Sequence, residues 1–446
     1  MRGGSPPAIV PEIDLASLAR MGRPGHMWAI GGCFAEAFER SGLSMREAVD
    51  ELGVSERQIK RYLADGCRVP KLVVERVREL ARLRTVRKPP RDPSSTWFRF
   101  IDLFAGIGGL RIGFEEIGGR CVFTSEWDKW SQKTYAHNFP HEEGHELVGD
   151  IRPYGEVPER LPRFDVLLAG FPCQPFSLAG VSKKNSLGRK HGFDDVHQGN
   201  LFFDIARILD HHRPAAFLLE NVKHLQRHDG GRTFEIIRRT LQEDLGYKID
   251  CRIISSEPWV PQRRERIFIA GFREDVGFDF GGFHQMIPPE CEWPKLGSVL
   301  QSHNEVDSKY TLTPHLWNYL QEYRRKHERQ GNGFGYSLFG PDDVARTLSA
   351  RYHKDGSEIL IDQPGMRPRR LTPVECSRLM GFEHGDRRFE IPRGVSDTQA
   401  YRQFGNAVAV PVVSAIAEYL RGPLEEMIAR DRAIRVSRPP AERKVA

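Results

Sequence analysis

The sequence predicts an α/β protein with a buried sheet, preceded by a small all-α domain. Short apolar runs recur from residue 98 onward: FRFIDLFAG, RCVFTSEW, FDVLLAG, AAFLLEN and RIFIAGF. Helical stretches such as LFFDIARILDHHR and RTFEIIRRTLQEDLG separate these runs. Strands that alternate with helices indicate βαβ units and a buried parallel sheet.

The composition is typical of a soluble globular protein. The chain has 446 residues, of which 39% are hydrophobic and 28% charged, enough for two or three domains. No apolar run has the length that a bilayer-spanning helix requires, so we expect no membrane. Seven scattered cysteines form no CxxC pair, so neither a zinc ribbon nor a disulfide framework is indicated, and we expect no metal. A cytoplasmic protein is therefore expected, and the net charge of +6 favours an anionic partner mildly.

Changes of composition divide the chain into segments. We expect a disordered N-terminus (1–26), a helical domain (27–85), a Pro/Ser-rich linker (86–97), the main α/β region (98–274), an irregular region rich in Gly, His, Arg and aromatic residues (275–365), a second helical region (366–425) and a flexible tail (426–446).

The helical domain has the pattern of a helix-turn-helix unit. Ser44 with Glu47 forms a candidate capping box before the apolar face of Ala48, Val49 and Leu52. Gly53 ends this helix and Ser55 caps the next. In that helix Ile59, Tyr62 and Leu63 are expected to face inward, and Arg57, Gln58, Lys60 and Arg61 outward. A small helical bundle with solvated basic residues is the alternative, but DNA binding is favoured because turn, cap and charge all match.

A nucleoside-type cofactor site is predicted at the first strand ends. Gly106, Gly108 and Gly109 form a turn between a strand and a helix, where a ligand can approach the backbone closely. Glu126 ends the next strand, at a position suited to ribose hydroxyls, with Trp127 beside it for stacking and Asp150 after a third strand. The spacing G-x-G-G is not the phosphate-binding GxGxxG, and no P-loop lysine follows. An adenosyl group without phosphates, such as S-adenosylmethionine, is therefore favoured.

A nucleophile is predicted at Cys173, between two prolines in GFPCQPFS after the run FDVLLAG. A stiff loop can aim a thiolate, and nearby cations stabilise that form. Glu220 ends the next strand, and Arg264 with Arg266 begins a later one. An inert thiol, a capping carboxylate and a surface ion pair are the respective alternatives. Their joint occurrence at successive strand ends favours one site.

The motifs DLFAGIGG, GFPCQPFS, ENV, QRRERIFI, RLTPVECSRLMGF and QFGNAVAVPV together resemble those of C5-cytosine DNA methyltransferases over about residues 98–422. The stretches SLAGVSKKNSLGRKHGF and ARTLSARYHKDGSEILID are most similar to the Dcm-like branch, which methylates the inner cytosine of CCWGG or CCNGG-type sites. The resemblance implies a Rossmann-like S-adenosylmethionine-dependent methyltransferase fold with a mixed sheet, helices on both faces and a smaller target-recognition domain at 275–365. The helix-turn-helix domain would be an N-terminal extension.

The resemblance also implies residue roles. The target cytosine leaves the duplex, because its ring atoms cannot be reached in the stack. Cys173 attacks C6, Glu220 holds the N3 edge and the amine, Arg264 and Arg266 position base and loop, and C5 takes the methyl group. Gln174 and Ser177 lie in a mobile loop over the DNA. The residues implied to hold the cofactor are Phe104, Gly106, Gly108, Glu126, Trp127, Asp150, Ile151, Leu201, Asn406 and Val408. Ala407 stands where many members have serine.

In the target-recognition segment, Arg346, Arg351, Tyr352 and Lys354 have side chains suited to base edges and phosphates, with a plain surface role as the alternative. We expect a monomer that binds double-stranded DNA at the bacterial nucleoid, as an orphan enzyme or beside a cognate restriction endonuclease. Two other functions are possible from the sequence. One is an added role as transcriptional autoregulator through residues 27–85, and the other is methylation of cytosine in tRNA.

Overall fold

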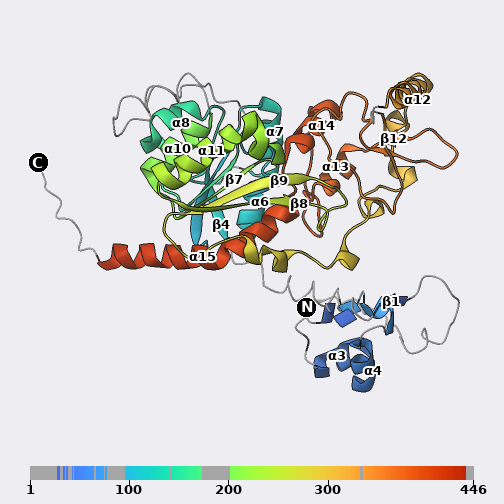
Figure 1. Cartoon of the computed structure of the whole chain (residues 1–446), viewed down its shortest axis with the longest axis horizontal. Coiled ribbons are helices and arrows are strands. Elements are labelled where there is room, and N and C mark those ends of the chain that lie inside the picture. Colours follow the sequence, from blue (N-terminus) through green and yellow to red (C-terminus); the bar gives the residue numbers. More distant parts are fainter. Residues whose placement is uncertain are drawn as a thin grey trace, which may run out of the picture. The chain divides into compact units, whose positions relative to one another are not determined.

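The computed structural model describes residues 28–30, 34–35, 37–38, 43, 45–64, 67–74, 76–77, 96–140, 142–172, 201–331 and 335–437. The chain divides into two compact units, Met1–Ser95 and Thr96–Ala446, each described below by itself (Figure 1). The division falls within the predicted linker 86–97.

In the described part of the N-terminal unit, helices α3 (Met45–Leu52) and α4 (Glu56–Tyr62) pack on a small core. The two helices are separated by a turn in which Gly53 has a φ of 61°. Ala48, Leu52 and Ile59 are fully buried, as the apolar pattern predicted. Ser55 occupies the N-cap position of α4 without a capping hydrogen bond from its side chain. The predicted cap Ser44 lies outside the described residues.

The prediction of an all-helical N-terminal domain is wrong in one respect. Strand β1 (Trp28–Ile30) pairs antiparallel with β2 (Arg68–Pro70). Strands of three residues are too short to show the alternation of apolar and polar side chains that identifies a strand in a sequence.

The second unit is built on a seven-stranded sheet with the order β5-β4-β3-β6-β7-β9-β8. Its strands are β3 (Phe98–Leu103), β4 (Gly119–Ser125), β5 (Glu146–Val148), β6 (Val166–Gly170), β7 (Ala216–Val222), β8 (Lys248–Ser255) and β9 (Glu265–Phe272). β3 to β7 are parallel, whereas β9 runs antiparallel to both β7 and β8. The sheet is therefore mixed.

Helices cover both faces of this sheet, as predicted, and each face has its own core (Figure 1). Alternate residues of the strands point to opposite faces; in β6, Val166 and Leu168 enter one core, and Leu167 and Ala169 the other. The first core contains side chains of α6 (Gly109–Glu116) and α15 (Val410–Ser437). The second contains side chains of α8 (Arg152–Glu156), α10 (Leu201–His212) and α11 (Arg232–Arg239), which continues into a π-helical turn at Thr240–Asp244.

Two predicted boundaries in this unit need correction. The predicted tail 426–446 begins too early, because α15 continues to Ser437 and buries Met427 and Ile428. The predicted recognition segment also begins too early, since Phe280 and Phe283 belong to the core beneath α15.

One stretch from α14 (Asp397–Asn406) through α15 has the length and hydropathy of a membrane span, but more than half of its apolar window is buried in the protein. The burial is that of a core helix.

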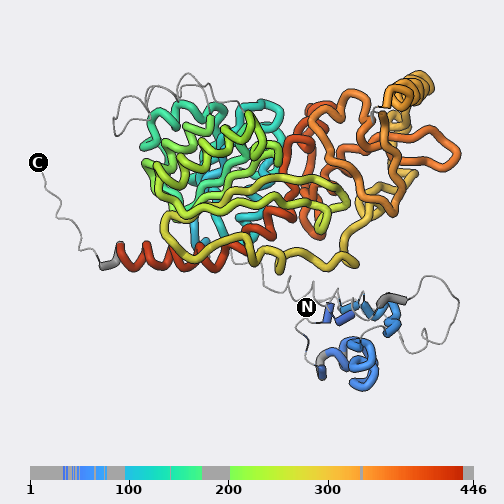
Figure 2. Tube along the Cα trace, in the orientation of Figure 1, coloured from blue at the N-terminus to red at the C-terminus, as the bar shows by residue number. Residues whose placement is uncertain are grey.

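A third core joins side chains of the rest of the recognition segment to side chains of the predicted region 366–425. Figure 2 shows these two stretches of the chain side by side. The recognition segment consists of short 3₁₀ turns, helix α12 (Pro314–Arg329), and the short strands β10 (Leu338–Phe339) and β11 (Leu360–Ile361). β10 pairs with β11, and β11 pairs in turn with β12 (Arg369–Arg370). Helices α13 (Pro373–Leu379) and α14 complete the region. Helix α7 (Lys129–Asn138) is linked to α14 by a hydrogen bond of 3.0 Å from the Thr134 hydroxyl to Gln403 Oε1.

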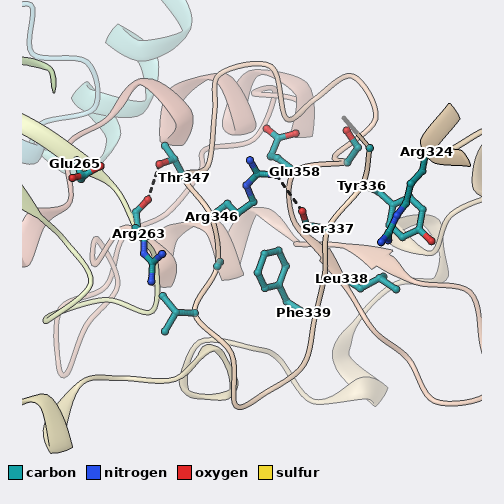
Figure 3. A pocket seen from close by; sticks show the side chains of 14 residues that line it. Arg263, Glu265, Arg324, Tyr336, Ser337, Leu338, Phe339, Arg346, Thr347 and Glu358 are labelled. Atoms are coloured by element: carbon teal, nitrogen blue, oxygen red, sulfur yellow. Dashed lines mark hydrogen bonds between the residues drawn. The ribbon is translucent and has the colours of Figure 1, made fainter. Parts of the chain in front are cut away.

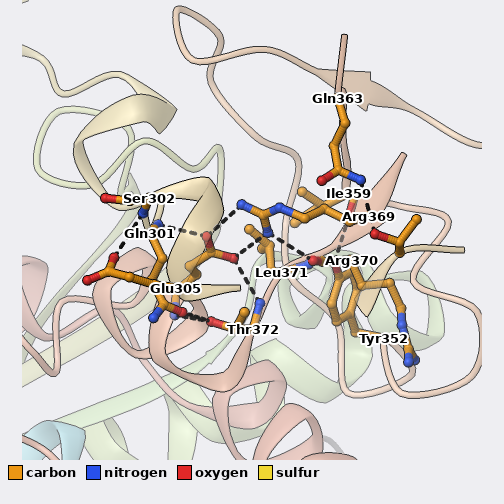
Figure 4. Close-up of polar contacts among 12 residues, drawn as sticks. Gln301, Ser302, Glu305, Tyr352, Ile359, Gln363, Arg369, Arg370, Leu371 and Thr372 are labelled. Atoms are coloured by element: carbon orange, nitrogen blue, oxygen red, sulfur yellow. Dashed lines mark hydrogen bonds and ion pairs between the residues drawn. The ribbon is translucent and has the colours of Figure 1, made fainter. Parts of the chain in front are cut away.

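A buried polar network stabilises this third core (Figure 4). Arg369 donates to both oxygens of Glu375 at 2.8 Å, and the same carboxylate accepts from the backbone N–H groups of Gln301 and Thr372 at 2.8 Å each. A fully hydrogen-bonded buried ion pair of this kind fixes the relative position of the segments it joins. Residues about 300 and 370 in the chain are thereby held together.

Candidate active site

The carboxyl ends of β3, β4, β6 and β7 meet at one edge of the sheet, and a cavity of about 530 Å³ lies there. Open α/β sheets bind ligands at this edge. The cavity is lined by Phe104, Gly106, Glu126, Trp127, Asp128, Ser131, Gly170, Phe171, Pro172, Leu201, Glu220, Asn221, Val222, Arg266, Gln399, Arg402, Gln403, Gly405, Asn406 and Ala407. The predicted cofactor and target-base residues are thus largely brought together.

A second hollow of about 350 Å³ shares Phe104, Glu126, Trp127 and Leu201 with this cavity and adds Asp150, Ile151 and Arg152. It begins at the glycine-rich turn, where Phe104, Gly106 and Gly108 have φ values of 57°, 59° and 89°. A positive φ is strained for phenylalanine, and strain of this kind persists where the surrounding structure enforces it.

Glu126 is anchored to that turn. Its carboxylate accepts hydrogen bonds from the backbone N–H groups of Gly106 and Asp128 at 2.7 Å each. Burial raises the pKa of Glu126, and these two hydrogen bonds oppose the rise. The carboxylate therefore stands at the rim of the hollow with a fixed orientation, which suits an acceptor for sugar hydroxyls.

The turn itself packs closely. A Cβ atom on Gly108 would lie 2.3 Å from the Phe139 ring, and one on Gly109 would lie 2.7 Å from a methyl group of Val408. Val408 thus packs beneath the turn and lines neither hollow, whereas Asn406 lines the larger cavity.

The sequence reasoning missed Arg152. Its guanidinium binds both oxygens of Asp150 at 2.8–3.0 Å and lies 5.8 Å from the centre of the Trp127 ring. The ion pair lowers the pKa of Asp150. Trp127 is 71% exposed, so its ring is available for stacking. An arginine two residues after the predicted acid was the available signal.

Glu220 and Arg266 form the polar centre of the larger cavity. Arg266 Nε lies 3.0 Å from Glu220 Oε1, and the two side chains are only 16% and 14% exposed. They lie diagonally across the antiparallel β7–β9 pair, where Glu220 is opposite Phe268. Burial raises the pKa of Glu220, and the cationic Arg266 and Arg264 counteract part of that rise.

Arg264 lies behind this centre and lines neither of the two hollows described above. It is fully buried and donates to the carbonyl oxygens of Leu348 at 2.9 Å, Gly405 at 2.9 Å and Ala407 at 2.6 Å. Burial, with repulsion from Arg266, lowers the pKa of Arg264 to about 9, which still leaves a cation at neutral pH. From this position Arg264 is not placed to contact the base, which was one of its predicted roles. Its hydrogen bonds instead hold together the segments around residues 348 and 405–407.

The predicted nucleophile Cys173 and the loop residues Gln174 and Ser177 lie outside the described residues. The residues just before this loop are described. Gly170, Phe171 and Pro172 line the cavity, and the buried Asn221 side chain donates to the carbonyl oxygen of Phe171 at 2.8 Å. The chain is therefore fixed at the cavity wall as far as Pro172.

The predicted DNA-contacting residues separate into three groups. Arg346 lines a groove of about 970 Å³ (Figure 3). Arg351 and Lys354 are exposed but do not line it. The prediction for Tyr352 is wrong: it is fully buried, donates to the Ile359 carbonyl oxygen and accepts from the Leu371 N–H at 2.7 Å each (Figure 4).

In the N-terminal unit, Arg57 and Arg61 are exposed, as predicted. Gln58 is half-buried and donates to the Tyr62 hydroxyl at 2.9 Å. Two of the three predicted contact residues of α4 are thus available at its surface.

The fold and this strand-end cavity define an α/β enzyme of the nucleoside-cofactor type. Residues 98–421 match the model of the C-5 cytosine-specific DNA methylase family, and the chain belongs to that family. The activity of the family, methylation of cytosine in DNA, is therefore the activity of this chain.

Several relatives are similar over most of their length. The DNA-cytosine methyltransferase of Escherichia coli K12 is 49% identical over 401 residues, covering 79% of this chain and 84% of the relative. Type II methyltransferase M.SsoII of Shigella sonnei is 43% identical and covers 89% of this chain and 99% of the relative, so its similarity extends to residues before 98. The S. pombe Dnmt2 methyltransferase structure has a TM-score of 0.56 at 19% identity, covers 74% of this chain and 99% of that one, and supports the fold.

Proposed function

We propose that the chain transfers a methyl group from S-adenosylmethionine to C5 of a cytosine flipped out of duplex DNA. The observation that carries the proposal is the buried Glu220–Arg266 pair, which faces the same cavity as the turn at Gly106 and the wall before Cys173. The cavity thus contains both a glycine-rich turn suited to a cofactor and a buried ion pair. Such a cavity can hold two molecules side by side and transfer a group between them.

The residues of the smaller hollow fit an adenosyl group. Glu126 offers an oriented carboxylate to ribose hydroxyls, the exposed Trp127 ring offers a stacking surface, and Asp150 offers lone pairs to an exocyclic amine. Ile151 and Leu201 supply apolar walls. Bound there, S-adenosylmethionine would supply an electrophilic methyl group.

The residues of the larger cavity fit a pyrimidine ring. Glu220, whose pKa is raised, can hold a proton and donate it to ring N3 while its second oxygen accepts from the exocyclic amine. Arg266 keeps that carboxyl in place. Cys173, aimed by its flanking prolines, would attack C6 as a thiolate and leave again once the C5 proton is lost. Gln174 and Ser177 would cover the DNA.

We infer that the target is the inner cytosine of CCWGG or another CCNGG-type site, because the stretches SLAGVSKKNSLGRKHGF and ARTLSARYHKDGSEILID resemble the Dcm-like branch. Bisulfite sequencing of DNA from cells that express the wild type or Cys173→Ala tests this. We expect methylation at that cytosine for the wild type only. Methylation at another site would keep the chemistry and contradict the specificity.

We further propose that the protein works as a monomer on nucleoid DNA in the bacterial cytoplasm, either alone or beside a cognate restriction endonuclease. The type II names of several relatives support the restriction–modification context. The same relatives do not favour the tRNA alternative. A competition assay between duplex DNA and tRNA for the enzyme would separate the two substrates.

A second function, repression of the chain's own promoter, is proposed for the N-terminal unit. The two-helix arrangement around Gly53 and the exposed Arg57 and Arg61 favour it. In full-length protein, Arg57→Ala/Arg61→Ala should abolish the mobility shift of a promoter fragment and leave methylation unchanged. An unchanged shift would exclude these arginines as the contact surface.

A further inference from the structure

The groove that contains Arg346 adjoins the larger cavity, and the first residues of β9 lie between the two. Glu265 lines the groove and Arg266 lines the cavity, as expected for neighbouring residues of a strand, whose side chains alternate between faces. DNA whose flipped base enters the cavity would therefore have its remaining bases near the groove.

Arg346 is available for a ligand in this groove. The other arginines that line it form ion pairs: Arg263 with Glu257 at 3.0 Å and Arg324 with Glu328 at 2.7 Å. In the described part of the chain, the Arg346 guanidinium donates one hydrogen bond, to Ser337 Oγ at 3.2 Å. Most of its five N–H donors thus remain for a bound molecule.

The backbone around Arg346 is fixed to the catalytic part. The Ala345 N–H donates to the Pro261 carbonyl oxygen at 2.9 Å, and the Arg263 N–H donates to the Ala345 carbonyl oxygen at 2.8 Å. The Leu348 N–H donates to Gln262 Oε1 at 2.7 Å, and the Thr347 hydroxyl donates to the Arg263 carbonyl oxygen at 2.7 Å. A recognition residue held this way needs little ordering when it binds.

Glu358 brings an acceptor to the same wall. Ser349 Oγ donates to one of its oxygens at 2.7 Å. The backbone next to Glu358 is also fixed, because the Ser357 carbonyl oxygen accepts from the Ser337 N–H. Ser337 in turn accepts the hydrogen bond from Arg346. Figure 3 shows Arg346, Ser337 and Glu358 together in the groove. A fixed donor and a fixed acceptor thus stand side by side.

We propose that Arg346 and Glu358 recognise one G·C pair of the target site from the major groove. Arg346 donates to guanine O6 and N7, and Glu358 accepts from the N4 amine of the paired cytosine. These are the pairings that the two side-chain types make with base edges, and a G·C pair presents the three atoms in a row. The proposal rests on the proposed function, because it assigns the recognition of that function's DNA site.

The test is a selection of bound duplexes by the full-length protein from a library randomised across the site, with methylation of the same library as a second readout. We expect Arg346→Ala and Glu358→Gln each to reduce the preference for G·C at the same single position, roughly ten- to hundredfold. Arg346→Lys, which keeps the charge but loses the planar fork, should lose that preference as well. Arg325→Ala, an exposed arginine of α12 outside the groove, is the matched control and should keep the wild-type preference.

Two results would overturn the proposal. If Arg346→Ala weakens binding equally for all sequences and makes the salt dependence shallower, Arg346 contacts a phosphate. If neither variant changes the preference at any position, the pair does not recognise bases. Because the selection measures binding, it gives an answer even if no cytosine is methylated, a result that would count against the proposed function instead.

Discussion

Two carboxylates at the same sheet edge differ in their surroundings, and this difference assigns their roles. Glu126 accepts two backbone N–H groups and stands at the rim of the cofactor-type hollow. Glu220 pairs with the Arg266 guanidinium at 3.0 Å, and the buried Arg264 also acts on it electrostatically. Burial raises the pKa of both carboxyls, and hydrogen bonds or cations oppose the rise in each case. Position makes the difference: Glu220 lies beside Arg266 in the larger cavity and is therefore the residue suited to proton donation to a bound base.

The substitution Glu220→Gln tests this role. Gln keeps the shape but cannot protonate ring N3, so kcat should fall roughly 10²- to 10⁴-fold. Because the pKa of Glu220 is raised, its proton is retained at a pH where an ordinary glutamate is ionised, and is lost as the pH rises further. Wild-type kcat/KM should therefore decline on the alkaline side through this pKa, and the decline should be missing in the variant. A variant with the wild-type pH profile would contradict the assignment.

Arg264 acts on its neighbours rather than on the substrate. Arg264→Ala leaves three carbonyl oxygens without their donor and Glu220 with one cation fewer, so we expect a loss of about 3–5 kcal/mol in the free energy of unfolding. Urea denaturation of the full chain measures it. Arg264→Lys should retain part of the stability, because an ammonium can still donate to these carbonyls. A fully stable Arg264→Ala protein with lowered kcat would instead favour a direct role at the base.

At the scale of elements, helix α14 joins the cavity to the recognition segment at Gly405. A Cβ atom there would lie 2.4 Å from the backbone of Ser349 and Ala350. The same turn of α14 carries Asn406 in the cavity wall and offers the Gly405 carbonyl oxygen to Arg264. The recognition segment and the cavity wall thus meet backbone to backbone, where small movements would affect both.

Gly405→Ala should push these two elements apart. Overpacking against backbone atoms costs about 1–3 kcal/mol or more, and we expect both DNA binding and cofactor binding to weaken. Gly422→Ala in α15, where a Cβ atom would meet nothing within 4 Å, is the matched control and should stabilise the protein by about 0.5–1 kcal/mol. Thermal unfolding and calorimetric titration give both quantities. Equal behaviour of the two variants would mean that the contact at Gly405 is not tight.

At the scale of the whole molecule, the sequence predicted those parts that depend on local pattern. The runs VLLAG of β6 and AFLL of β7 are continuously apolar, and the acids at strand ends, Glu126 after β4 and Glu220 near the end of β7, are recognisable by position. β8 was missed because KIDCRIIS mixes charged and apolar residues, as a half-exposed edge strand does. Tyr352 was assigned to DNA because its burial depends on Ile359 and Leu371, whose positions follow from the third core rather than from neighbouring residues.

The two units have separate hydrophobic cores, and this predicts separate responses to core mutations. Ile59 is fully buried in the N-terminal unit, so Ile59→Ala should destabilise that unit by about 2–5 kcal/mol. Hydrogen exchange should report the loss in α3 and α4 and not in the sheet of the second unit. The methylation rate should stay at the wild-type value. Loss of protection in both units would mean that they unfold together.

The central claim, transfer of a methyl group to C5 of cytosine by a cysteine-dependent site, is tested most directly by nucleoside mass spectrometry. Purified wild type and Cys173→Ser are incubated with S-adenosylmethionine and a duplex that carries CCWGG, and the DNA is digested. The account predicts 5-methylcytosine from the wild type and none from Cys173→Ser. Methylation at N4 of cytosine, or 5-methylcytosine from both proteins, would contradict it.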